Sequence, residues 1–312
     1  MVVAAYNAEP WVGEAVRSVL RQTMADFELV VVDDASTDDT ARAVDRERDP
    51  RLRLVRNERN LGQACTWNRA VSLCSAPFVK FLCADDFLRA DCLEQMLAVA
   101  EPSPSVGLVF SRRSIAVSPD DAVGVEWRET YEASHERFGL LGAVNSGRRL
   151  FDALAEEEFP DNWIGEPSNV MLRRELFTLL GGFHSEIRQP VDFELWLRAM
   201  FHGDVGFVDA ELATYRVLTN SVTRATESEG SRWLDRLWLL ESLLADKEIS
   251  AAHPEIAAMA RSERLHAAGR LGKSLVSRAR TIQRLGEARR YVSYKLRDET
   301  PAGTAAASGR AR

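Results

Sequence analysis

Acidic residues follow two apolar runs in the N-terminal half of the chain. Asp33 and Asp34 follow one run, and Asp85 and Asp86 follow another. Carboxylates are hard oxygen ligands, so such a pair can hold a divalent cation, and the cation can hold a phosphate. The alternative is that these acids cap the helices that come next. Residues 85–86 alone do not decide between a cap and a metal site.

A third acid, Asp192, lies at the start of a predicted helix, where it too could be an N-cap. Capping explains any one of these three sites. It explains all three less well, because adjacent carboxylates repel each other unless a cation or a hydrogen-bond donor offsets their charge. The set therefore favours a ligand site.

The elements that must position these acids alternate between strands and helices. Short apolar runs predict strands at residues 2–5, 27–32, 77–82 and 106–110, and an alternating pattern predicts one at 51–55. Intervening patterns predict helices after the first strand, after a cap at Ser36 or Thr37, and at 63–73 and 88–100. In a doubly wound α/β sheet, ligands bind outside the carboxyl ends of the strands, which is where the acids fall.

The second half of the chain shows a weaker pattern. Residues 112–165 are mixed and irregular, and we expect them to face the substrate. A strand is predicted at 169–172, a helix at 173–180 closed by two glycines, a helix at 192–201, and one or two strands at 205–215. From about residue 230 the composition is helical, and residues 300–312 have a composition typical of disorder. We therefore predict an α/β domain at 1–225, a helical extension at 226–298 and a disordered tail at 299–312.

Composition narrows the classes of protein. The chain of 312 residues is 46% hydrophobic and 28% charged, as in soluble globular proteins, and its net charge of −7 disfavours a nucleic-acid binder. No signal peptide and no apolar run of ~20 residues is visible, which predicts a cytoplasmic protein. The four cysteines form no C-x-x-C pair and have no nearby His, which favours free thiols over a zinc site. Gly-rich signatures of dehydrogenases and P-loop NTPases are absent.

Residues 261–297 contain eleven Lys or Arg and two acids, in contrast to the acidic remainder of the chain. Such a basic helical stretch can rest on the anionic inner face of a membrane and bring an enzyme to a lipid-linked acceptor. It can equally be a solvated helix face or an oligomer contact. The sequence leaves these interpretations open.

Taken in order, the motifs resemble those of family-2 glycosyltransferases. They are VAAYN at 3–7, ELVVVDDASTDDT at 28–40, NLG at 60–62, FLCADD at 81–86, GGF at 181–183 and VDFELWLR at 191–198. The resemblance covers about residues 2–223 and implies a GT-A fold. It also implies a nucleotide-diphospho-sugar donor, a divalent cation (manganese or magnesium) and inversion at the anomeric carbon. The implied role is surface-polysaccharide or similar glycan assembly.

The resemblance assigns roles by position. Tyr6 would pack on the base and Asp34 would bind it, and a carboxylate suits a base with a ring N–H. Asp86 would be the main metal ligand, Asp85 would contact ribose or metal, and Asp192 would be the general base. The remaining donor-side residues are Asn7, Glu9, Asp33, Asn60 and Gly62, and the acceptor-side residues are Trp163 and Glu166. The alternatives are core packing for Tyr6, turn chemistry for Asp34 and surface loop packing for the acceptor pair.

Four positions depart from the family pattern. Ala5 replaces a Pro, Cys83 an Asp, Val191 a Glu and Leu218 a His. These departures keep a second hypothesis open, a non-catalytic nucleotide-sugar-binding protein of the same fold. A nucleotidyltransferase is a third hypothesis, but it would need a basic Gly-rich loop after the first strand, and residues 6–13 contain no Lys or Arg.

Overall fold

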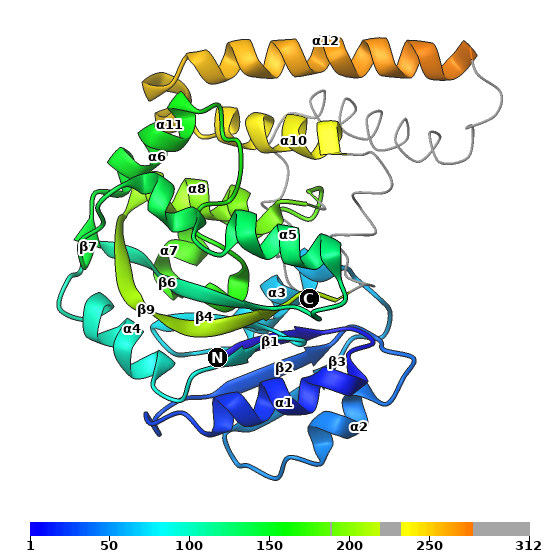
Figure 1. The fold of residues 1–312 in the computed structure, drawn as a ribbon, viewed down its shortest axis with the longest axis vertical. Helices are drawn as coiled ribbons and strands as arrows, with labels where there is room; N and C mark the ends of the chain where they lie inside the picture. The colour runs from blue at the N-terminus through cyan, green and yellow to red at the C-terminus, as the bar shows by residue number, and fades with distance from the viewer. Residues whose placement is uncertain (188, 219–231, 277–312) are drawn as a thin grey trace, which may run out of the picture.

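The computed structural model describes residues 1–187, 189–218 and 232–276. These residues build a layered α/β structure in which helices cover both faces of one nine-stranded sheet (Figure 1). The strand order is β3-β2-β1-β4-β8-β6-β9-β5, and β7 pairs with β9 on the side. The predicted doubly wound α/β architecture is confirmed.

Four parallel strands form the N-terminal half of the sheet. They are β1 (Val2–Ala5), β2 (Leu29–Asp33), β3 (Leu52–Arg56) and β4 (Phe78–Cys83). The register pairs Ala4 with both Val32 and Cys83, and Ala5 with Asp33. The residues that follow these strands therefore emerge at one edge of the sheet.

The C-terminal half of the sheet is mixed. It contains β8 (Val170–Arg173), β6 (Val106–Ala116), β9 (Asp204–Arg216), and the two-residue strands β5 (Phe87–Leu88) and β7 (Val144–Asn145). β8 is antiparallel to both β4 and β6, whereas the long β6 and β9 pair in parallel. β9 also pairs with β5, so a late strand closes over the turn after β4.

The pleat of each strand divides the core into two layers. Val3, Ala5 and Val31 point into the layer of α1 (Glu9–Leu20), α2 (Thr40–Asp45) and α4 (Cys92–Ala100). Val2 and Val32 point into the opposite layer, which contains α3 (Gln63–Ser72), α6 (Gly147–Glu156), α7 (Arg174–Leu179) and α8 (Val191–His202). Apolar residues on both faces explain why these strands appear in the sequence as continuous hydrophobic runs.

Three local predictions were wrong. The helix predicted at 88–100 begins only at Cys92, because Phe87 and Leu88 pair with β9. Neither Ser36 nor Thr37 caps α2, whose N-cap position is Asp39 and has no side-chain hydrogen bond. Residues 112–165 are not irregular, because they contain α5 (Ala122–Tyr131), η1 (Ser134–Phe138) and the amphipathic α6.

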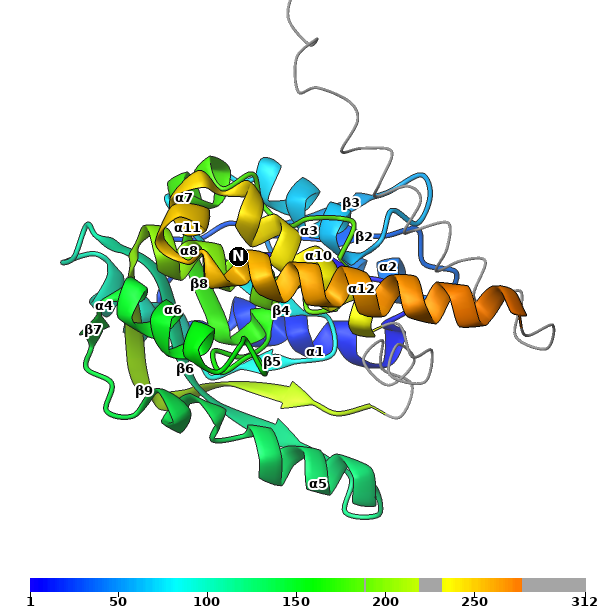
Figure 2. The same ribbon diagram turned by 90° about the horizontal axis from the view of Figure 1, so that it is seen from above.

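A helical layer covers α6 and α8 on the side away from the sheet. It consists of α10 (Arg232–Ala245), α11 (Lys247–Ala252) and α12 (Glu255–Val276), which lie above the sheet in Figure 1 and across it in Figure 2. The predicted helical extension is thus present, while its exact boundary at 225/226 falls in residues outside the described part and stays a prediction. Much of the basic stretch 261–297 also lies outside it. No helix among the described residues is long and apolar enough to cross a bilayer.

A buried ion pair fastens α8 to its surroundings. Glu194 and Arg198 are one helical turn apart, and Arg198 Nε donates to Glu194 Oε1 over 2.6 Å. The guanidinium also donates to the Gly182 carbonyl oxygen at 2.8 Å, and Ser242 of α10 donates to Glu194. Burial raises the pKa of Glu194, but hydrogen bonds from His184 and Arg198 outweigh it and lower the pKa to about 2. The helix that begins beside Asp192 is therefore held by charge as well as by packing.

Candidate active site

The carboxylate of Asp34 organises the loop after β3. It accepts hydrogen bonds from Asn57 Nδ2 at 2.6 Å and from the backbone amides of Leu61 and Gly62 at 2.9 Å each. Asp34 is almost fully buried. A carboxylate has about four acceptor positions, so three protein donors leave one for a ring N–H of a base. The turn-chemistry alternative therefore describes part of its role, and base binding stays a prediction.

Asn60 and Gly62 shape the rim of this loop. Asn60 Oδ1 accepts from the Gly62 amide at 3.0 Å, and both residues are exposed. Gly62 has φ of 85°, a left-handed conformation that disfavours any residue with a Cβ. The predicted loop beside the donor is thus present at the sheet edge.

Tyr6 and Asn7 leave β1 beside this loop. Tyr6 is 50% exposed, which excludes the core-packing alternative and leaves its ring free to contact a base. Asn7 has φ of 48° and ties two turns together, since its Oδ1 accepts from the Thr37 amide and its own amide donates to Ser36 Oγ. Glu9 is exposed at the start of α1.

Asp33 serves the framework of this half-site. Its side chain is fully buried, forms an ion pair with Arg56 Nε at 2.7 Å and accepts from the Ser36 amide at 3.1 Å. Arg56 is its register partner on β3. The ion pair fixes the turn that presents Asp34, and a direct donor contact of Asp33 stays a prediction.

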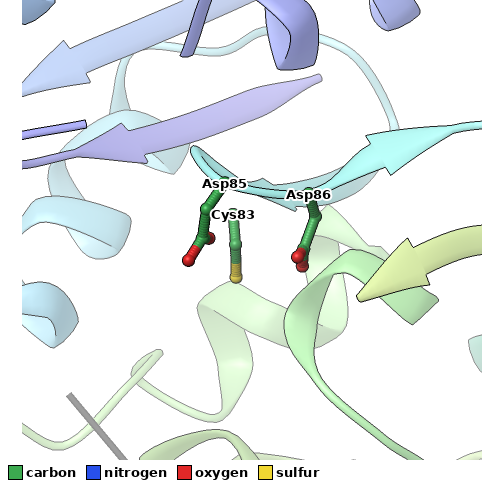
Figure 3. A group of neighbouring side chains, drawn as sticks. All are labelled: Cys83, Asp85 and Asp86. Carbon is green, nitrogen blue, oxygen red and sulfur yellow. The ribbon is translucent and has the colours of Figure 1, made fainter. Parts of the chain in front are cut away.

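The turn after β4 presents three possible ligand atoms. The side chains of Cys83, Asp85 and Asp86 point to the same side of the turn (Figure 3), and one ligand atom from each lies within 4.8 Å of the others. α4 begins six residues later, so Asp85 and Asp86 do not cap it. The capping alternative is excluded.

Asp86 is the buried member of this group. Its Oδ2 accepts from Ser168 Oγ at 2.5 Å, and its Oδ1 accepts from the Arg216 amide at 2.9 Å. Burial and the neighbouring Asp85 raise the pKa of Asp86 well above its ordinary value. Asp85 is only half-buried, and burial raises its pKa while the Arg216 guanidinium opposes the rise.

Two carboxylates and a thiol are a chemically suitable donor set for a divalent cation. Burial raises the pKa of the Cys83 thiol, so this cysteine is protonated unless a cation displaces the proton. Two acids that repel each other gain from a shared cation, because its charge offsets both. Asp85 is the more open carboxylate, while both oxygens of Asp86 already accept protein hydrogen bonds.

Arg216 brings a fixed positive charge to the same turn. Its guanidinium lies over the Trp11 ring at 4.3 Å and the Phe87 ring at 5.4 Å, and it donates to Glu14 at 2.9 Å. Its buried Nη1 has no hydrogen-bond partner within the described parts of the chain. This cation sits two residues before Leu218, where the family pattern has a His.

Asp192 lies in the first turn of α8, and Pro190 occupies the N-cap position. The N-cap alternative is therefore excluded. Asn162 Nδ2 donates to Asp192 Oδ2 at 3.3 Å. Burial, and then the negative charge of Glu166, raise the pKa of Asp192 to about 6. A carboxylate with this pKa suits general-base chemistry near neutral pH.

Glu166 links Asp192 and the acidic turn electrostatically. Its charge acts on both Asp192 and Asp86, and its Oε2 accepts from Arg113 Nη1 at 2.8 Å. Gly165 permits this approach, since a Cβ there would lie 2.7 Å from Arg113 Nη1. Trp163, predicted as an acceptor contact, is instead buried and packs edge-on against Phe138 at 5.0 Å. Its acceptor role stays a prediction without support from this packing.

Several site residues were missed by the sequence analysis. Ser168 bonds to Asp86, 82 residues away, and Asn162 bonds to Asp192, 30 residues away. Both are polar residues, and no local sequence pattern marks them as partners of these acids. Asn57 follows β3 directly, and its position after a strand was a signal that could have found it. Tyr215 and Arg216 end β9 in the same way.

Comparison with known proteins gives a consistent result. Residues 1–180 match the model of the family described as glycosyl transferase family 2. An uncharacterized protein of Mycobacterium tuberculosis is 36% identical over 241 residues, which are 77% of this chain and 74% of that protein. The Escherichia coli enzyme UDP-Glc:alpha-D-GlcNAc-diphosphoundecaprenol beta-1,3-glucosyltransferase WfgD is 37% identical over 99 residues, which are 32% of this chain and 39% of that enzyme.

Solved structures share the fold at low sequence identity. TarS 1–349 of S. aureus in complex with UDP-GlcNAc has a TM-score of 0.64 and 19% identity, covering 90% of this chain and 77% of that one. The mannosyltransferase PcManGT from Pyrobaculum calidifontis, in complex with GDP-Man and Mn²⁺, has a TM-score of 0.54 and 20% identity, covering 95% and 79%. These matches support the GT-A-type architecture.

Proposed function

The chain belongs to glycosyl transferase family 2 and is a glycosyltransferase, and from this premise we propose that it inverts the anomeric carbon of a nucleotide-diphospho-sugar while transferring the sugar to an acceptor hydroxyl. The observation that carries the proposal is that Asp34 and Asp85 follow two parallel strands, β2 and β4, which both pair with β1, while the charge of Glu166 acts on both Asp86 and Asp192. We assign base binding to Asp34, diphosphate binding to the acidic turn and proton abstraction to Asp192.

On the donor side, residues that leave β1 and β2 would hold the nucleotide. The exposed ring of Tyr6 would stack on the base, and the remaining acceptor position of Asp34 would take a ring N–H. Because the loop at 57–62 is already tied to Asp34, the base would meet a site that needs little reordering.

At the acidic turn, Asp85 and Cys83, with Asp86 behind them, would hold a divalent cation. A bound cation supplies positive charge that offsets the charge of the leaving diphosphate. Arg216 would add a permanent cation beside Asp85, and its buried Nη1, which has no hydrogen-bond partner among the described residues, would donate to a phosphate oxygen. This guanidinium supplies positive charge two residues before Leu218, which replaces the family's His.

On the acceptor side, Asp192 would take the proton from the attacking hydroxyl oxygen as that oxygen bonds to the anomeric carbon. The bond from that carbon to the diphosphate oxygen breaks on the opposite side, which is why the configuration inverts. Asn162 would hold one carboxylate oxygen of Asp192 and leave the other to face the hydroxyl. Burial, and then the charge of Glu166, raise the pKa of this carboxyl to about 6, which suits a group that accepts a proton near neutral pH.

The wider role that we propose is assembly of a surface polysaccharide or similar glycan. The name of WfgD, with a nucleoside-diphosphate glucose donor and a lipid-linked acceptor, supports this class of reaction. Peripheral contact of the basic C-terminal helices with a membrane belongs to the same proposal. Residues 1–225 would form the transferase domain and 226–298 its helical extension.

Two measurements test the proposal. Melting temperatures of the full chain are recorded with a panel of UDP-, GDP- and dTDP-sugars, each with and without Mn²⁺, followed by turnover of Asp192→Asn. We expect cation-dependent stabilisation by at least one donor and loss of turnover in the variant. If no donor stabilises the chain, the donor site is refuted. That result would contradict both the transfer reaction and the non-catalytic nucleotide-sugar-binding alternative. Stabilisation without turnover in the unmodified chain would instead support the non-catalytic alternative.

A further inference from the structure

Three aromatic rings form a continuous stack next to the acidic turn. Trp127 and Tyr131 of α5 have ring centroids 4.9 Å apart, and Trp127 and Tyr215 of β9 have centroids 5.2 Å apart, with an interplanar angle of 40° in each pair. All three residues are half-buried, so none of them is sealed in the core. None of these residues belongs to the motifs that assign donor or metal roles.

The stack begins at the site itself. Tyr215 precedes Arg216, whose amide donates to Asp86, and the charges of Glu166, Asp86 and Asp85 reach the Tyr215 hydroxyl. Burial first and then these carboxylates raise the pKa of Tyr215, so its hydroxyl remains protonated. A neutral phenol next to carboxylates can donate a hydrogen bond, but it carries no charge to attract a phosphate.

The order of strands places the stack on the acceptor side. Tyr6 follows β1, the acidic turn follows β4, and the stack lies over the ends of β6 and β9 farther along the sheet. α5 runs beside the outer ends of these two strands in both views (Figures 1 and 2). The acidic turn therefore separates the stack from the base side, as attack opposite the leaving diphosphate requires.

The same arginine that holds Glu166 also anchors the stack. Arg113 Nη1 donates to Glu166 Oε2 at 2.8 Å, and its Nη2 donates to the Tyr131 carbonyl oxygen at 2.5 Å and to Ser134 Oγ at 3.0 Å. Glu132, at the end of α5, accepts from the Ile115 amide at 2.9 Å. Arg113 thus fixes the position of the Glu166 carboxylate relative to α5. A binding site with few polar groups needs such fixed positions, because those groups alone orient the ligand.

We propose that the stack of Trp127, Tyr131 and Tyr215 binds an uncharged pyranose ring of the acceptor glycan, with Glu166 accepting hydrogen bonds from its hydroxyls. This inference rests on the proposed transfer reaction. The face of a pyranose carries C–H groups that pack on an aromatic ring, while its hydroxyls point outward to polar groups. Anionic acceptor sugars are disfavoured, because the negative charges of Glu166, Asp86 and Asp85 act at the Tyr215 hydroxyl.

The test uses the full chain and a panel of methyl α- and β-glycosides of glucose, galactose, mannose and N-acetylglucosamine as acceptors. Saturation-transfer NMR, with the aromatic protons irradiated, should mark the C–H protons of one sugar face in those glycosides that accept transfer. Trp127→Ala should raise the acceptor KM about tenfold, whereas Trp127→Phe should change it little. The control is Val123→Ala, since Val123 is 64% exposed on the same helix.

The donor readout distinguishes the possible failures. Stabilisation by donor and cation should be the same in Trp127→Ala as in the unmodified chain. An unchanged acceptor KM, an equal loss of donor binding, or no saturation transfer to any glycoside would overturn the stack as an acceptor site. Absence of donor stabilisation in the unmodified chain would overturn the proposed function instead. The NMR map needs no variant, so it decides even if Trp127→Ala does not fold.

Discussion

Removing the charge of Asp192 should make the protein more stable and less active. Burial raises the pKa of this carboxyl from its ordinary value to about 6. The folded state therefore holds its proton more tightly than the unfolded chain does. The stabilisation from this group is present in full below about pH 4 and is lost as the pH rises through about 6.

The size of the effect follows from the shift. The pKa shift is about two units. Near pH 8, where Asp192 is ionised, this shift lowers the free energy of unfolding by at most roughly 3 kcal/mol. Partial solvent access to Asp192 reduces this figure. Asp192→Asn should thus melt higher than the unmodified chain at pH 8, while the difference should vanish near pH 4. Turnover should fall by about 10²–10⁴-fold, the usual loss for a missing general base.

The unmodified enzyme should show the same group in its pH profile. With a pKa near 6, about a tenth of the base is ionised at pH 5, so kcat/KM should be about a tenth of its plateau there. Glu166→Gln removes a neighbouring negative charge and should shift this acidic limb to lower pH. Nucleoside diphosphate release, measured from pH 5 to 8, is the assay. A flat profile over that range, or a limb that moves upward in Glu166→Gln, would refute the reasoning.

Three other outcomes are expected. Adding Cd²⁺ should produce a thiolate-to-metal absorption band in the near ultraviolet that Cys83→Ser lacks, because a thiolate prefers soft cations; an identical band in both proteins would exclude Cys83 as a ligand. Glu194→Gln should lower the free energy of unfolding by about 3 kcal/mol and the melting temperature by several degrees, since it leaves a buried guanidinium without its carboxylate; a melting curve that does not move would argue against the ion pair as a fastening of α8. Tyr6→Ala should weaken binding of the nucleoside diphosphate about tenfold in calorimetry, while Tyr6→Phe retains it; equal affinities in the two variants would remove the stacking role.

The donor half of the molecule could be predicted because its information is local. β1, β2 and β4 are mostly apolar runs and β3 alternates, and the residues of interest come immediately after these strands in sequence. Parallel strands share one carboxyl edge, so sequence adjacency to a strand end becomes proximity in space. Asp34 and Asp85 were found for this reason.

The acceptor half could not be predicted in the same way. Ser168 reaches Asp86 across 82 residues, and a two-residue strand such as β5 has no periodicity to detect. α5 buries only Gly124 along its length, so its place depends on contacts with β9 and on Arg113. α6 is different, because its cap at Ser146 and its apolar stripe are local signals that we missed when we treated this region as irregular.

The hydrogen bond from the Arg216 amide to Asp86 has a consequence for the order in which the chain folds during synthesis. The two residues are 130 positions apart, and β9 supplies both this bond and the partner for β5. During synthesis from the N-terminus, β1 to β4 can pair long before β9 has left the ribosome. The turns around Asp34 can therefore form early, but the acidic turn lacks one of its two hydrogen-bond donors, and the edge of β6 stays open, until residue 216 arrives. Any function that depends on the acidic turn thus requires the chain through residue 216.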